Sequence, residues 1–183
     1  SADGTTWAEQ TSGTTEGLNG VTYANDTFVA VGFAGTILTS PDGVTWTLQT
    51  SGTTKDLFGV NYGNGLLVTI GATGTILTST DSETWTLQTS DTTGYLLEVT
   101  YGNNTFVVPV GSGNTAGESG KILTSINGTT WTTESSGTTN VLRAVAYGNS
   151  TFAITGDGGT ILTSCDETIT TYESTNLALY NLD

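Results

Sequence analysis

The sequence predicts an all-β fold made of four repeats of about 40 residues, and three observations carry this prediction. One phrase that ends in tryptophan recurs along the chain, at Trp7, Trp46, Trp85 and Trp131. Threonine, a good strand residue, is the most frequent residue, and 25 glycines supply turns. Short runs of alternating apolar and polar residues lie between these turns. Repeats of this kind bury their apolar faces against their neighbours, so the repeat sets the fold.

The second repeat shows the expected order of elements. Its apolar runs predict strands at 57–62, 66–70, 75–79 and 84–88. Glycine-rich turns separate the first three strands, and the phrase around Asp81 forms the turn before the fourth. The repeat is therefore expected to be a meander of four short antiparallel strands.

The other repeats follow the same order. First strands are expected at 18–23, 97–101 and 142–147, second strands at 28–31, 106–110 and 152–155, and third strands at 36–40, 121–125 and 160–164. Four such strands in about 40 residues are typical of a β-propeller blade. We therefore expect one domain over 1–183, a four-bladed β-propeller with repeats at 11–49, 50–88, 89–134 and 135–173. A β-solenoid is the alternative, although its coils are usually shorter and less hairpin-like.

The third repeat carries an insertion at residues 112–118, between its second and third strands. Loops that extend from a repeat scaffold often carry function, and they are also tolerated as plain surface excursions. Both interpretations are open from the sequence.

The chain contains more fourth strands than a closed four-bladed ring requires. They are expected at 5–10, 45–49, 84–88, 130–134 and 168–173, and the tail 174–183 holds a further apolar strand. A surplus strand with an apolar face can pair with another copy, and exchange that does not close yields a filament. A loose tail or an outer strand on the last blade is the alternative. The candidate assembly residues are Trp7 in the first of these strands and Leu177, Leu179 and Leu182 in the tail.

The recurring phrase Ser-x-Asp-Gly-x-Thr-Trp, preceded by Gly-Thr-Ile-Leu-Thr, resembles the Asp-box (BNR) repeat of sialidases, sortilin-type receptors and photosystem II assembly-factor-like propellers. The resemblance covers nearly the whole chain. It implies that the Asp or Asn side chain caps the turn between the third and fourth strands and that the Trp packs between blades. The spacing is that of a shorter variant than the common sialidase box, and the last copy, 164–170, lacks its glycine and tryptophan. The matching pairs are Asp42 and Trp46, Asp81 and Trp85, and Asn127 and Trp131.

The composition argues against catalysis and against several partners. A net charge of -14 with three basic residues disfavours nucleic acid and anionic membrane surfaces, and no apolar run is long enough to span a bilayer. Arg143 alone cannot form the arginine triad that the sialidase resemblance implies, and the chain has no histidine. Glu98, Glu134 and Asp157 are interpreted as surface charges, and Cys165 has no catalytic or disulfide partner. We therefore expect no enzyme activity, no metal and no cofactor.

Four Asn-x-Ser/Thr sequences are candidate glycosylation sites. They begin at Asn25, Asn103, Asn127 and Asn149, and all but Asn127 fall at the same turn of their repeats. Asparagine is also a favoured turn residue, so a duplicated turn explains the pattern equally well.

These features predict a non-catalytic, secreted structural protein, the glycosylated subunit of an extracellular assembly or fibre that joins to itself by terminal strand exchange. The chain has no Met and begins at Ser1, which is typical of a mature form. The alternative is a propeller that binds carbohydrate or protein, with Tyr95, Phe33 and Phe58 as candidate contacts. An assembly factor of the photosystem II type is disfavoured, because those rings have more blades.

Overall fold

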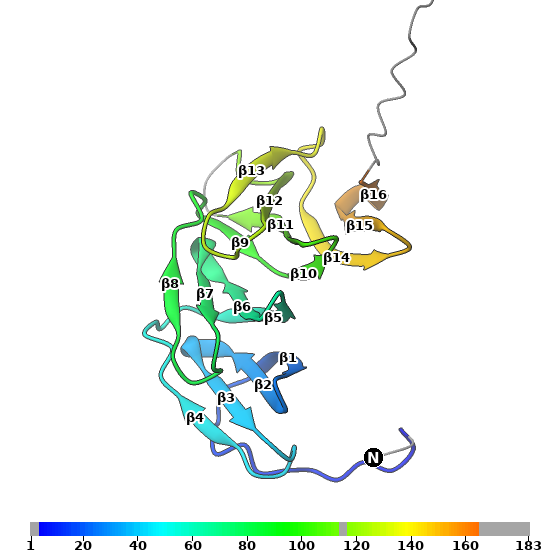
Figure 1. Cartoon of the computed structure of the whole chain (residues 1–183). Coiled ribbons are helices and arrows are strands. Elements are labelled where there is room, and N and C mark those ends of the chain that lie inside the picture. The colour runs from blue at the N-terminus through cyan, green and yellow to red at the C-terminus, as the bar shows by residue number, and fades with distance from the viewer. Residues whose placement is uncertain (1–3, 114–116, 165–183) are drawn as a thin grey trace, which may run out of the picture.

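The computed structural model describes residues 4–113 and 117–164, which fold into four antiparallel β-sheets (Figure 1). Sheet 1 contains β1 (Leu18–Ala24), β2 (Thr27–Gly32), β3 (Ile37–Ser40) and β4 (Thr47–Gln49). Sheet 2 contains β5 (Leu57–Gly63), β6 (Leu66–Gly71), β7 (Ile76–Ser79) and β8 (Thr86–Gln88). Sheet 3 contains β9 (Gly94–Leu96), β10 (Thr100–Gly102), β11 (Thr105–Gly113), β12 (Lys121–Ser125) and β13 (Thr132–Ser135). Sheet 4 contains β14 (Leu142–Gly148), β15 (Thr151–Gly156) and β16 (Thr160–Thr163).

The prediction of an all-β chain is confirmed. The helical turns within the described ranges are three single 3-10 turns, η1 (Phe33–Gly35), η2 (Ala72–Gly74) and η3 (Asp157–Gly159), which follow the second strands of sheets 1, 2 and 4. None of the described helical turns has the length needed to cross a bilayer.

The sheets stand side by side along an arc (Figure 1). Their strands follow one another in chain order, as a meander, with β1, β5, β10 and β14 on the inner side and β4, β8 and β13 on the outer side. The inner strands of neighbouring sheets contact one another, β1 with β5, β5 with β10, and β10 with β14. This radial order of strands is the arrangement of propeller blades.

The expected closed four-bladed ring is not what residues 4–113 and 117–164 form. Sheet 1 lies at one end of an open arc and sheet 4 at the other, with a wide opening between them (Figure 1). The angle between neighbouring sheets is set by how their faces pack. Three such sheet-to-sheet contacts leave sheets 1 and 4 apart. The repeat number therefore does not fix closure.

Two-residue turns connect β1 to β2, β5 to β6, β10 to β11 and β14 to β15. Asn25, Asn103 and Asn149 begin these turns with φ of 49°, 44° and 49°, and Asn64 has φ of 51°. Such hairpin turns need left-handed backbone at both central residues, which Asn and Gly tolerate best. The left-handed backbone of these turns thus favours the repeated asparagines.

The inner edge of sheet 3 differs from the expected single strand at 97–101. Two short strands, β9 and β10, replace it, and both pair with β11. At the start of the insertion, β11 continues through Ser112 to Gly113 and pairs there with Gly94, which extends the inner edge to β9. The insertion is therefore partly a strand extension rather than wholly a loop.

The prediction of a strand at 5–10 is wrong, because residues 4–17 form no strand in the structure. A strand forms only where a sheet edge is available, and sheet 1 already has its four strands. The strands expected at 168–173 and in the tail, with Leu177, Leu179 and Leu182, lie outside the described residues, as does Cys165.

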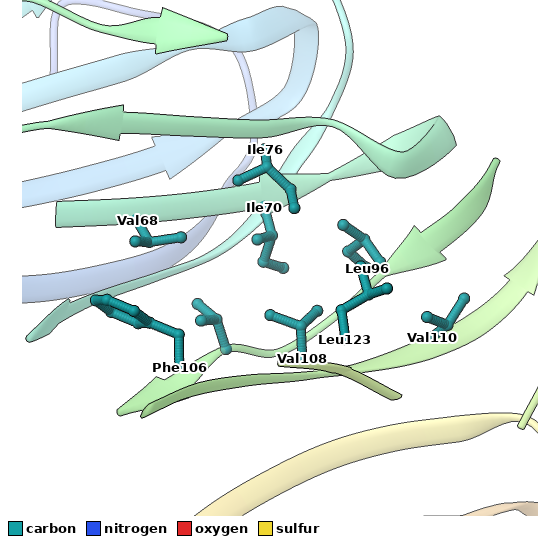
Figure 2. Close-up of a cluster of buried hydrophobic side chains, with 9 residues drawn as sticks. Val68, Ile70, Ile76, Leu96, Phe106, Val108, Val110 and Leu123 are labelled. Carbon is teal, nitrogen blue, oxygen red and sulfur yellow. The ribbon is translucent and has the colours of Figure 1, made fainter. Parts of the chain in front are cut away.

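Apolar cores fill the spaces between neighbouring sheets. Between sheets 2 and 3, nine buried side chains face one another across the gap, with Ile70 and Ile76 on one side and Phe106 and Leu123 on the other (Figure 2). A similar cluster lies between sheets 1 and 2, and a smaller one between sheets 3 and 4. Burial of each such side chain contributes about 1.5–3 kcal/mol, so each sheet depends on its neighbour for stability.

Candidate functional site

The conspicuous Asp residues are held inside their own turns. Asp42 Oδ1 accepts hydrogen bonds from the backbone N–H groups of Val44 (2.8 Å) and Thr45 (2.7 Å). Asp81 accepts the equivalent bonds at 2.9 and 2.7 Å, and Asn127 at 3.0 and 2.9 Å. A serine hydroxyl also donates to each of the three. Their acceptor atoms are therefore engaged within the fold.

These backbone donors favour the charged carboxylate. They lower the pKa of Asp81 to about 2, and they lower the pKa of Asp42 in the same way. A carboxylate with such a pKa is a poor general acid near neutral pH.

Two of the box tryptophans close the gaps between sheets. The indole N–H of Trp85 donates to Ser82 O (3.1 Å), and that of Trp131 donates to Gly128 O (3.0 Å). Trp85 packs against the cluster between sheets 1 and 2, and Trp131 against the cluster between sheets 2 and 3. Each tryptophan thus fills the space between its own sheet and the preceding one.

The three acids interpreted as surface charges lie on different elements: Glu98 between β9 and β10, Glu134 in β13 and Asp157 in η3. Asp157 is paired with the only arginine, Arg143, whose Nη2 donates to Asp157 Oδ2 at 3.0 Å. Partial desolvation raises the pKa of the Glu98 carboxyl, although its side chain is exposed. Within the described ranges, no cluster of three or more His, Cys, Asp or Glu could hold a metal ion.

The insertion contributes one carboxylate, that of Glu118, which is hydrogen-bonded and ion-paired within the fold. Glu118 accepts a hydrogen bond from the Thr92 hydroxyl and one from Thr93 N (3.3 Å), and it forms an ion pair with Lys121 (3.0 Å). These partners lower the pKa of Glu118, the Thr92 hydroxyl most. A hollow of about 530 Å³ lies beside it, and most of its lining residues are of polar types, among them Lys55 and several threonines.

The candidate aromatic contacts do not form one platform. Phe58 and Tyr95 lie edge to face with ring centroids 6.1 Å apart, and Phe58 packs against the core between sheets 2 and 3. Phe33 lies on sheet 1 against Gly17. The sequon residues Asn25, Asn103 and Asn149 are exposed, and the Asn25 side-chain oxygen accepts a bond from Tyr62 Oη (2.8 Å).

A mainly apolar groove of about 480 Å³ lies between sheets 3 and 4. Val107 and Ile122 line it from sheet 3, and Phe152, Ile154 and Leu162 line it from sheet 4. The edge strand β16 borders it, and within the described ranges β16 pairs with β15 alone. A large apolar slot thus lies next to a sheet edge that can accept another strand.

This groove corresponds to the place that tryptophan takes between the other sheets. The clusters on either side of sheet 2 each have a box tryptophan packed on them, whereas the cluster beneath the groove has none among its described neighbours. Sequence reasoning did not place a site here. The sequence does contain a signal for the groove, because the last box copy, 164–170, has threonine where the other copies have tryptophan.

The outer faces of the two end sheets are also apolar and open. Val21 of sheet 1 is 65% exposed, whereas the equivalent Val60 of sheet 2 is 8% exposed because sheet 1 covers it. Leu18, Val21 and Trp46 border a hollow of about 330 Å³ on this face. At the other end of the arc, Ile161 of β16 is 72% exposed. Each end of the arc therefore exposes apolar positions that a neighbouring sheet covers elsewhere in the arc.

No model of a known protein family matches the chain. No curated protein matches it either. Solved structures do: YCF48 from Cyanidioschyzon merolae superposes with a TM-score of 0.64 at 19% identity, over 84% of this chain and 54% of that one. YCF48 bound to D1 peptide gives 0.61 at 19% identity, over 82% and 50%. The computationally designed Ika4 protein gives 0.64 at 11% identity, over 82% and 92%.

These likenesses confirm the propeller class of the fold and show nothing further about this chain. The chain spans about half the length of the two YCF48 structures that it matches. Membership of the Asp-box family stays a prediction.

Proposed function

We propose that this chain is a non-catalytic binding propeller that takes an extended segment of polypeptide as an added strand beside β16. The groove between sheets 3 and 4 carries this proposal. An edge strand offers main-chain hydrogen bonds to an incoming segment, and a neighbouring apolar slot selects one of its side chains. The slot has the position that an indole occupies between the other sheets, so the segment is expected to carry a large aromatic residue.

Two further observations support a binding role without chemistry. The carboxylates of Asp42, Asp81 and Asp157 are all engaged by turn donors or by Arg143. A propeller of similar fold, YCF48, has been captured with D1 peptide. For the present chain, polypeptide is therefore a better candidate ligand than a small substrate.

Selection from a random peptide library displayed on phage tests the proposal. The bait is the full chain with Trp7→Ala, so that its own exposed indole does not compete. We expect enrichment of peptides with one large aromatic residue. Their binding should weaken on the order of tenfold or more when Leu162→Arg places a charge in the groove, because Leu162 lines the groove and packs on the cluster beneath it.

Ile126→Arg is the control, because it adds the same charge at an exposed apolar residue on a box turn outside the groove. This control should bind the selected peptides as the bait does, and circular dichroism should show both arginine variants folded. A library that yields no binder, or binders whose affinity is unchanged by Leu162→Arg, would overturn the proposal.

A structural, extracellular role is the second candidate, favoured by the apolar faces exposed at both ends of the arc. In that role the exposed turn residues Asn25, Asn103 and Asn149 would carry glycans. Expression in a eukaryotic secretory host, followed by intact mass with and without enzymatic deglycosylation, tests this part. An unchanged mass would exclude N-glycans there.

A further inference from the structure

The linker before β1 is folded like the linkers that join sheets. In residues 11–17, Ser12 Oγ donates to Thr14 O (3.2 Å), and Glu16 N donates to Thr14 Oγ1 (3.0 Å). The linker after β4 repeats these bonds at Ser51 and Thr53 with 3.1 Å each, and the linker after β13 does so at 3.3 and 3.1 Å. Since those two linkers follow a fourth strand, residues 4–10 stand in the position of a fourth strand of a preceding sheet.

The segment before this linker has the geometry of a box turn at Gly4 and Trp7. Gly4 has φ of 74°, close to the 72° of Gly43 and the 71° of Gly128 in the box turns. The Trp7 indole N–H donates to Gly4 O (3.1 Å), as the box tryptophans of sheets 2 and 3 do. Trp7 itself is 80% exposed. The chain therefore presents the indole that the groove lacks.

The chain's own last box copy is a poorer candidate for the groove. Alignment of the repeats places Glu167 where Gly128 has positive φ, and Thr170 where Trp131 stands. A glutamate is strained in that backbone conformation, and threonine is too small to replace an indole. Residues 4–10 keep both the glycine and the tryptophan.

We propose that the groove between sheets 3 and 4 is filled by residues 4–10 of a second copy of this chain, with Trp7 in the slot and the segment added as a strand to β16. The completed sheet 4 then covers the open face of the donor's sheet 1. This inference rests on the proposed function, because it names the polypeptide that the groove takes.

The two end faces match in detail. Within the arc, the Tyr101 ring packs on Gly63 of the preceding sheet, and the Tyr147 ring packs on Gly102. The equivalent Gly148 of sheet 4 has open space where a side chain would stand, and the equivalent Tyr23 of sheet 1 is exposed. In the head-to-tail junction, Tyr23 of one copy packs on Gly148 of the next. Such a junction uses two different surfaces, so it closes a ring or continues as a filament.

Light scattering after size-exclusion chromatography tests the junction with the full chain and point variants. The wild-type chain should exceed its monomer mass of 18.8 kDa at least twofold, and Trp7→Ala, Ile161→Arg and Val21→Arg should each return that monomer mass. Ile126→Arg and Leu48→Arg are the matched controls, since their exposures of 72% and 65% equal those of Ile161 and Val21. Both controls should assemble like the wild type.

Mixing two of these variants makes the test specific. Trp7→Ala retains an intact groove, and Ile161→Arg retains an intact segment 4–10, so together they can form one wild-type junction. We expect a complex of two chains from the mixture and monomers from each variant alone. A labelled peptide of residues 4–10 should bind Trp7→Ala, and the same peptide with Trp7→Ala on the order of tenfold or more weaker.

The outcomes separate this inference from the proposed function. A monomeric wild-type chain, or a mixture that does not combine, overturns the inference; binding of library peptides to the groove would then leave the proposed function standing. If neither library peptides nor residues 4–10 bind, both fail. A ring and a filament in electron microscopy both support the junction, provided that Trp7→Ala abolishes them.

Discussion

At the scale of the residue, the box turns need an acceptor rather than a charge. Asp42, Asp81 and Asn127 make the same two backbone hydrogen bonds with their Oδ1 atoms. The charge affects how the turn responds to pH, because bonds from N–H donors to a carboxylate are stronger than those to an amide. Of the three box turns at Asp42, Asp81 and Asn127, two are therefore acid-sensitive and one is insensitive.

Asp81→Asn should reduce the acid sensitivity of folding. The pKa of Asp81 is about 2 in the folded chain, below its ordinary value of 3.8, so its contribution to stability is fully present above about pH 4. That contribution is lost as the pH falls towards 2. Thermal melting should show the variant less stable than the wild type at pH 6, with the difference shrinking by pH 2. A difference that is equal at both pH values would contradict this account.

At the scale of the element, the inner strands approach one another where glycine permits it. A Cβ on Gly63 would lie 2.1 Å from the Tyr101 ring, and one on Gly102 would lie 2.1 Å from the Tyr147 ring. Gly148 ends β14 in the same way, but nothing lies within 4 Å of the corresponding position. The repeat therefore keeps a glycine at a place where the single arc does not need one.

Gly63→Ala and Gly148→Ala should consequently differ. The first forces the Tyr101 ring aside and should cost about 1–3 kcal/mol, as overpacked cores do. The second meets open space and should leave the unfolding free energy of a monomeric background, such as Trp7→Ala, within about 0.5 kcal/mol. Urea unfolding of both variants measures this. Equal losses would show that the two glycines share a role unrelated to the tyrosine ring.

At the scale of the whole molecule, an open arc exposes residues that its interior buries. Val21 and Ile161 belong to positions that are covered wherever a neighbouring sheet is present, as at Val60 and Ile76. The net charge of -14 on every copy opposes this apolar attraction by electrostatic repulsion. Copies of the chain therefore repel one another at a distance and attract one another only in contact.

Association should accordingly increase with salt. The repulsion between copies is long-ranged at about 0.01 M ionic strength and largely screened at about 1 M, whereas burial of apolar faces is not weakened by salt. Light scattering at the two ionic strengths should show the larger assemblies at high salt. Ile161→Arg should remain monomeric in both, which separates the junction from simple salting-out. Assemblies that dissociate at high salt would mean that ion pairs hold the junction.

The strand pattern, the turns and the box could be predicted from the sequence because they depend on neighbours in the chain. Alternation in β5 and β6, left-handed asparagines such as Asn25, and the Asp81 acceptor all act within a few residues. The sequence also made Trp7 a candidate for assembly, which stays a prediction. Strand β9 could not be predicted in this way, because the pairing of Gly113 with Gly94 joins residues far apart in the chain.

The four repeats, their β-structure and the chemistry of each turn thus follow from local sequence patterns. Closure, the groove and the state of residues 4–10 were decided by the tertiary structure. This is because closure depends on the angle at which whole sheets pack, and strand pairing depends on whether a free sheet edge lies next to the segment. Local sequence patterns specify neither the packing angle nor the available sheet edge. The same Trp-containing phrase therefore packs between sheets at Trp85 and lies exposed at Trp7.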